Sequence, residues 1–131
     1  MANITPSFTP LPAPGDVAGY AIKWGPMANG DIGVSVDMLG FADRSIQVEG
    51  VFGAGGNAEI QGSNDTLTFR PLHDPIGVLL DVTAATDKIR HIMEITRLLR
   101  PVITAGDGTT ALTVTIFVCG SSSRLSIQGG T

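Results

Sequence analysis

The sequence predicts an all-β protein, either an antiparallel β-sandwich or a jelly-roll-like barrel, with an extended, Pro-rich N-terminal arm. Apolar and polar residues alternate over several short segments, which is typical of strands with one buried face. Gly, Asn and Asp turn signals separate these segments at regular spacing. The 131 residues suffice for one domain with a buried core. We therefore expect an arm over residues 1–16 and a single β-sandwich domain over residues 17–131.

The arm is defined by closely spaced prolines: Pro6, Pro10, Pro12 and Pro14. Each proline fixes φ and lacks an amide donor, which favours an extended chain over a helix or a central strand. Two interpretations remain open, a disordered tail and a semi-rigid strap that lies on a neighbouring subunit. In the second, Phe8 and Leu11 are the anchors. We expect the fold to survive removal of residues 1–16.

Alternation predicts three strands in the first half of the domain: 17–24, 32–38 and 45–52. The next stretch, NAEIQGSNDTLTFRPL over 57–72, predicts a hairpin about a turn at 63–65, because short Asn and Asp side chains bond back to the local backbone. Leu67 and Phe69 alternate with polar residues on its return strand. Trp24 is the only tryptophan, and we expect it in the core or in an interface.

The second half of the domain predicts a short strand over 78–83 and a long hairpin of 98–104 and 110–119. An Asp-Gly pair at 107–108 supplies the turn of that hairpin. Residues 84–99 fit both helix and strand, and we expect a helical turn over 84–89 followed by strand. Phe117 falls on the outer, Thr-rich face of the last long strand, so we expect something to cover it. A weak strand is predicted over 124–128.

The composition is poor in charge. Charged residues make up 15% of the chain, below the roughly 25% of soluble domains. Either Gly, Ser and Thr cover the surface or much of it lies against another chain, and we favour the second interpretation. A net charge of −4 without a basic run disfavours nucleic-acid binding. The N-terminus lacks the features of a secretory signal, and no apolar run is long enough to cross a bilayer. We expect a protein made in a cytoplasm.

No motif predicts catalysis, a cofactor or a metal. His73, His91 and Cys119 lack the spacing of metal ligands, and Cys119 ends an apolar strand, where an inert buried thiol is usual. No serine lies in a G-x-S-x-G turn. The glycines at 53, 55 and 56 join two strands, whereas a phosphate loop precedes a helix. We therefore expect a protein that is not an enzyme.

Three motifs occur together in this chain: GSND at 62–65, TFRPL at 68–72 and LLRPVIT at 98–104. Their combination resembles small β-rich proteins encoded among the head and structural genes of tailed bacteriophages, over residues 20–119. In that group a GSND hairpin is followed by a strand with an "IRP" motif. Thr66 and Phe69 depart from the pattern, because Gly and Trp are commoner at those places.

The resemblance implies a capsid cement (decoration) protein that binds the outer surface of the major capsid protein shell. Its location would be the virion exterior, and it would act as a homodimer or homotrimer without a cofactor. The interface candidates are Phe8, Leu11, Trp24 and Phe117.

Two alternatives remain open. One is another phage structural component, such as a tail-tube or head–tail connector subunit, which would form rings. The other is a carbohydrate-binding jelly-roll module, because the SND hairpin is also similar to discoidin-type domains. A sugar site needs exposed aromatic rings, and Tyr20 and Trp24 are its candidates.

Overall fold

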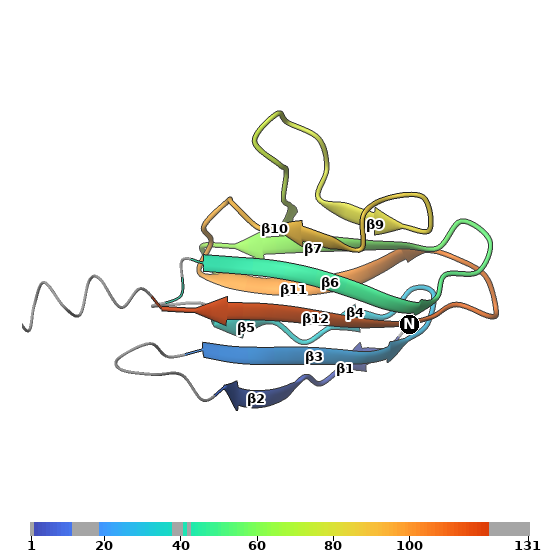
Figure 1. Ribbon diagram of the computed structural model, residues 1–131, viewed down its shortest axis with the longest axis horizontal. Helices are drawn as coiled ribbons and strands as arrows, with labels where there is room; N and C mark the ends of the chain where they lie inside the picture. Colours follow the sequence, from blue (N-terminus) through green and yellow to red (C-terminus); the bar gives the residue numbers. More distant parts are fainter. Residues whose placement is uncertain (1, 12–18, 38–40, 42, 121–131) are drawn as a thin grey trace, which may run out of the picture.

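A computed structural model gives the structure of the protein and describes residues 2–11, 19–37, 41 and 43–120. Within these ranges the chain forms twelve strands in two sheets, with no helix (Figure 1). The predicted all-β sandwich is therefore confirmed. In the same ranges there is no helix of the length and apolar character needed to cross a membrane.

The first sheet has five strands and is antiparallel throughout. Its order across the sheet is β10 (Ile89–His91), β6 (Asp43–Val51), β12 (Ala111–Cys119), β3 (Gly19–Met27) and β2 (Ser7–Leu11). The long strands β3, β6 and β12 lie at its centre, and the short strands β10 and β2 form its edges.

The second sheet has seven strands and is mixed. Its main order is β1 (Asn3–Ile4), β4 (Ile32–Gly33), β11 (Leu98–Ala105), β7 (Asn57–Ser63) and β8 (Arg70–Pro71). Two further short strands join it, β5 (Val36–Asp37) on β11 and β9 (Asp81–Thr83) on β7. The parallel contact in this sheet is between β1 and β4.

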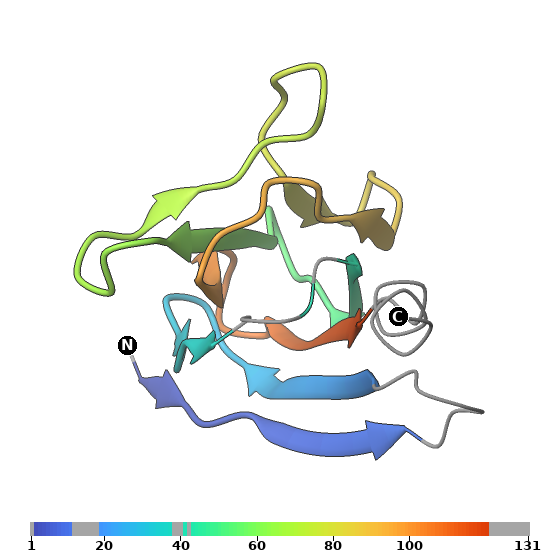
Figure 2. The same cartoon turned by 90° about the vertical axis from the view of Figure 1, so that its left-hand side faces the viewer.

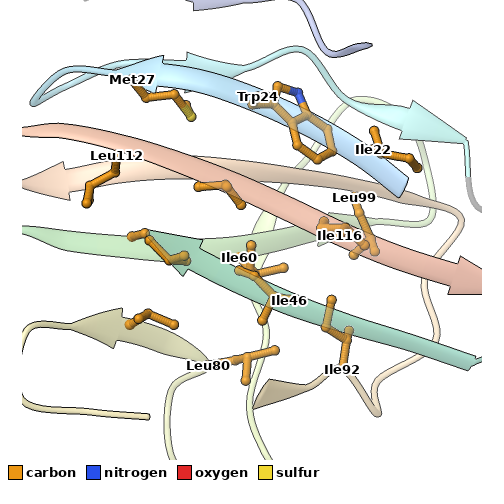
Figure 3. Packing of buried hydrophobic residues seen from close by; sticks show 14 of the residues in the cluster. Ile22, Trp24, Met27, Ile46, Ile60, Leu80, Ile92, Leu99, Leu112 and Ile116 are labelled. Carbon is orange, nitrogen blue, oxygen red and sulfur yellow. The ribbon is translucent and has the colours of Figure 1, made fainter. Parts of the chain in front are cut away.

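The core lies between the sheets and follows from the alternation along β12. Its even-numbered side chains from Leu112 to Val118 are buried. The register places Ile116 beside Ile22 of β3 and Ile46 of β6, so three strands bury side chains in one row. Figure 3 shows these side chains together with Ile60 and Leu99 of the opposite sheet directed into the same space. Each such burial stabilises the fold by about 1.5–3 kcal/mol.

The N-terminal segment is extended, and its described part is paired within its own domain. Residues 3–4 pair with β4 of one sheet, and residues 7–11 pair with β3 of the other. The segment therefore bridges the two sheets along one side of the sandwich (Figure 2). Removing residues 1–16 would strip an edge strand from each sheet, so the structure argues against the expectation that the fold tolerates this deletion. Residues 12–18 lie outside the described residues.

The helical turn expected over 84–89 is absent. A hydrogen-bonded turn occupies 84–86, where the Thr86 amide donates to the Thr83 carbonyl at 3.3 Å. The hydroxyl of Thr86 also accepts from the Thr83 amide at 2.9 Å. These two bonds close a turn, after which the chain forms strand at β10 (Ile89–His91) and then a loop over 92–97, so the expected strand is confirmed only in part. The strand predicted over 124–128 lies outside the described residues.

Gly33 is a position where the sandwich tolerates no side chain. A Cβ atom there would lie 2.6 Å from Cδ of Pro101 and 2.8 Å from Cδ1 of Trp24, both rigid and packed. At Gly108, by contrast, a Cβ atom would meet nothing within 4 Å, and the backbone is not left-handed.

We expect Gly33→Ala to lower the free energy of unfolding by about 1–3 kcal/mol through overpacking. The matched substitution Gly108→Ala should change it by no more than about 0.5 kcal/mol. Urea denaturation of the two variants and the wild type measures both effects. Equal stability of the two variants would contradict the packing between β4 and β11.

Candidate interaction surfaces

Trp24 belongs to the core. Its side chain is 0% exposed, and its indole Nε1 donates to the Val34 carbonyl at 2.9 Å. This bond satisfies the polar atom of the ring inside the sandwich. Of the two places expected for Trp24, the structure therefore shows the core, and the ring offers no surface to a partner.

Phe8 lies at an apolar pocket of about 280 Å³ at the open edge of the sandwich. It pairs with Ile22, so it is on the inward face of β2, yet its side chain stays 55% exposed. Tyr20 and Phe41 pack edge to face beside it, with ring centroids 5.7 Å apart. Arg44 Nε donates to the Phe41 carbonyl at 2.7 Å. The residues around the pocket are Phe8, Tyr20, Ile22, Asp37, Phe41 and Val118.

Leu11 and Phe117 lie on the opposite, outer face of the five-stranded sheet. Leu11 pairs with Gly19, and Phe117 pairs with Ala21 in the same strand β3. Phe117 is 42% exposed, whereas Leu11 is partly buried. The four interface candidates thus occupy three places: the core, the edge pocket and the outer face.

A larger apolar surface, which the sequence analysis did not identify, lies on the loops between β7 and β11. We call it the loop face and define it by six exposed residues: Leu67, Ile76, Val78, Leu79, Met93 and Ile95. Figure 2 shows the loops that carry them leaving the sandwich in different directions, the loop after β7 to the left and the loop between β8 and β9 to the top. Leu67 and Ile76, at 86% and 84%, are its most exposed members. The sequence contains one signal for this surface. Ile76 follows Pro75 inside a predicted turn, and residues in turns are usually exposed.

The loop carrying Leu67 is ordered by Asp65. The Asp65 carboxylate accepts from the amides of Leu67 at 2.9 Å and Thr68 at 2.7 Å, and from the Ser63 hydroxyl at 3.0 Å. Asn64 Oδ1 accepts from the Arg97 amide at 3.0 Å and so ties this loop to the one before β11. These bonds replace the predicted return strand by an open loop that shortens β8 to residues 70–71.

The loop over residues 72–80 is a small hairpin with Ile76 at its tip. His73 and Leu79 form a β-bridge, and the Asp74 amide donates to the Val78 carbonyl at 2.8 Å. At its base, Glu94 accepts from the His73 amide and lies 3.7 Å from the imidazole Nδ1. The apolar tip is therefore carried on a structured support.

A second acidic turn lies at the opposite end of the sheets. The Asp107 carboxylate accepts from the Thr109 hydroxyl at 2.6 Å, from the Thr109 amide at 2.8 Å and from the Ala54 amide at 2.8 Å. The Thr109 hydroxyl, followed by the Ala54 and Thr109 amides, lowers the pKa of Asp107 to about 2. The amides of Thr68 and Leu67, with the Ser63 hydroxyl, lower the pKa of Asp65 to about 2 in the same way. Both carboxylates fasten loops.

Among the described residues, no three His, Cys, Asp or Glu side chains are grouped as metal ligands would be. Comparison of the chain with known protein families, with curated proteins and with solved structures found no match. The chemistry of its surfaces is therefore the basis for assigning a function.

We expect stability to fall as the pH drops from about 4 toward 2. Asp65 and Asp107 have folded pKa values of about 2 against an ordinary 3.8. A depressed folded pKa contributes stability above the unfolded value, and this contribution is lost as the pH falls through the folded one. Thermal unfolding from pH 5 to pH 2 measures the change. The double variant Asp65→Asn, Asp107→Asn should depend on pH less steeply than the wild type, and an unchanged slope would contradict this assignment.

Proposed function

We propose that this protein is a structural binding protein that docks onto a larger protein lattice through its loop face. The observation that carries the proposal is the presence of six exposed apolar side chains on the ordered loops between β7 and β11. Large apolar patches on otherwise polar surfaces mark sites of protein association.

The area of the loop face suits this role. With the surface of a large aliphatic residue, the exposed fractions add up to roughly 600 Å², distributed over the loops 64–69, 72–80 and 92–97. One partner in a standard protein interface contributes about 800 Å². The loop face could therefore supply most of one side of a specific contact.

The order of the loops also supports docking. Binding through disordered segments costs conformational entropy, whereas surfaces already held in place lose less on association. Asp65 and Asn64 fasten the loop that carries Leu67, and Asp74 fastens the one that carries Ile76. The apolar side chains are thus displayed on backbone that needs little rearrangement.

The lattice we propose is a phage shell, with this chain as its capsid cement protein bound to the major capsid protein on the virion exterior. The motifs that carry the phage resemblance flank the loops of the loop face, although none of its six apolar residues lies within them. GSND provides Asn64 and Asp65, TFRPL leads into β8, and LLRPVIT begins β11. Self-association into a homodimer or homotrimer belongs to the same proposal, since many copies on one lattice bind with avidity.

The carbohydrate-binding alternative is weakened by the position of its candidate rings. Trp24 is buried, and Tyr20 is partly buried beside Phe41. Neither presents a flat exposed face on which a sugar could stack. A tail-tube or connector role would use the same docking surface, and ring formation in solution would favour it.

We expect the purified protein to decorate empty shells of the major capsid protein encoded in the same genome. The double variant Leu67→Thr, Ile95→Thr should bind at least tenfold more weakly, because both residues lose apolar area on the loop face. Co-sedimentation with shells measures occupancy.

A matched control is Val51→Thr, which alters a similarly exposed apolar residue at the end of β6, away from the loop face. It should bind as the wild type does. Equal weakening of shell binding by the double variant and by Val51→Thr would contradict docking through the loop face. Failure of the wild-type protein to bind shells would refute the proposed function.

A further inference from the structure

We propose that the hairpin over residues 73–79 is a preformed anchor whose tip, Ile76, inserts into an apolar recess of the lattice protein, and that Arg90 positions it. This inference rests on the proposed function and identifies the contact that contributes most to docking. In Figure 1 the loop between β8 and β9 projects farther from the sandwich than the neighbouring loops.

The hairpin is closed by backbone bonds at three levels. The Gly77 amide donates to the Asp74 carbonyl at 3.0 Å, and the Asp74 amide donates to the Val78 carbonyl at 2.8 Å. Below them, the Leu80 amide donates to the Leu72 carbonyl at 2.8 Å. Gly77 has φ of +88°, a left-handed conformation that glycine adopts readily. The tip therefore keeps one shape in the free protein.

The Asp74 side chain stiffens the tip from within. Its Oδ1 accepts from the amides of Ile76 at 3.0 Å and Val78 at 2.9 Å. Pro75 fixes one further backbone angle between them. Ile76 is consequently displayed at 84% exposure on a backbone whose amides at Ile76, Gly77 and Val78 already have partners. A partner can bury this side chain without leaving those three amides unsatisfied.

Arg90 joins the hairpin to the sheets. Its Nη1 donates to the Asp81 carbonyl at 2.8 Å, and its Nη2 lies 3.3 Å from Asp74 Oδ2. Both side chains of this ion pair are only 19% exposed, so solvent screens it less than a surface pair. Arg90 itself lies in β10 opposite Ile46, a core residue. Arg90 therefore fixes the orientation of the hairpin relative to the two sheets.

The chemistry of the hairpin indicates its partner. Asp74 is paired with Arg90, so the tip of the hairpin presents apolar side chains without a free charge of its own. A matching surface is a recess one side chain deep, lined by apolar residues and without a charged rim. Binding should therefore change little with ionic strength, because no exposed ion pair forms across the contact.

The area of the hairpin favours a lattice subunit over a second copy as the occupant. Its three exposed apolar residues, Ile76, Val78 and Leu79, offer roughly 300 Å², well below the roughly 800 Å² that one side of a stable pair buries. The contact is sufficient only where the remainder of the loop face binds the same partner. A lattice binds each copy through several contacts at once, so a contact too small to hold a free pair of copies together can still add to the binding.

The test compares Ile76→Ser with Ile76→Val and with Ile89→Ser, measured as dissociation from shells of the major capsid protein. Ile76→Ser should dissociate at least tenfold faster, and Ile76→Val should restore most of the residence time. Ile89 is exposed on β10 outside the loop face, and Ile89→Ser should behave as the wild type. The wild-type rate should stay within about twofold between low and high salt.

The positioning role of Arg90 has a readout that needs no shell. Arg90→Gln should speed amide hydrogen exchange at Ile76 and Val78 and weaken shell binding, while Arg90→Lys should restore part of both. Ile76→Ser should leave exchange unchanged. Equal exchange in Arg90→Gln and wild type would overturn the positioning role.

Two further outcomes would overturn the anchor. The first is normal shell binding by Ile76→Ser, which would leave the docking proposal intact because the wild type still decorates. The second is concentration-dependent self-association that Ile76→Ser abolishes in light scattering, which would make a second copy the occupant. Failure of the wild type to bind shells at all would instead refute the proposed function.

Discussion

The structure depends on the register of β12 between β3 and β6. This strand pairs along its whole length with β6 and from Leu112 to Cys119 with β3, apart from an irregularity between Leu112 and Val114, and it points its even-numbered side chains at the opposite sheet. Because side chains alternate with a period of two, a slip of one residue would move the entire row to the outer face. This pairing places the half of the core that the five-stranded sheet contributes, together with the end of the Asp107 turn that leads into β12.

The long strands could be predicted from the sequence because their alternation is regular. The segment 110–119 corresponds to β12 over Ala111–Cys119, and 45–52 corresponds to β6 over Asp43–Val51. The loop face could not be predicted in the same way. The alternation around Leu67 predicts an inward residue of a return strand. Leu67 is exposed instead because the Asp65 carboxylate accepts hydrogen bonds from the amides that follow it, which holds this segment in a loop. Such local competition with sheet pairing leaves little trace in hydrophobic patterning.

The interface candidates show that residue type alone does not distinguish a core position from an interface position. A tryptophan suits a core and an interface equally, and only the long-range approach of Val34 and Gly33 places Trp24 inside. Phe8 and Leu11 are an odd number of residues apart, so within a strand they must face opposite sides. Phe8 and Leu11 could contact the same partner surface only if the arm were not part of a sheet. Residues 7–11 instead form the edge strand β2, which directs the two side chains to opposite faces.

Pro10 has a consequence for the open edge of the five-stranded sheet. It lies in β2, which ends the five-stranded sheet within the described residues. A proline has no amide hydrogen to donate to an added strand, and prolines on sheet edges discourage sideways growth. A strand from another molecule would therefore lose a backbone hydrogen bond at this edge, which disfavours edge-to-edge growth of the sheet through β2.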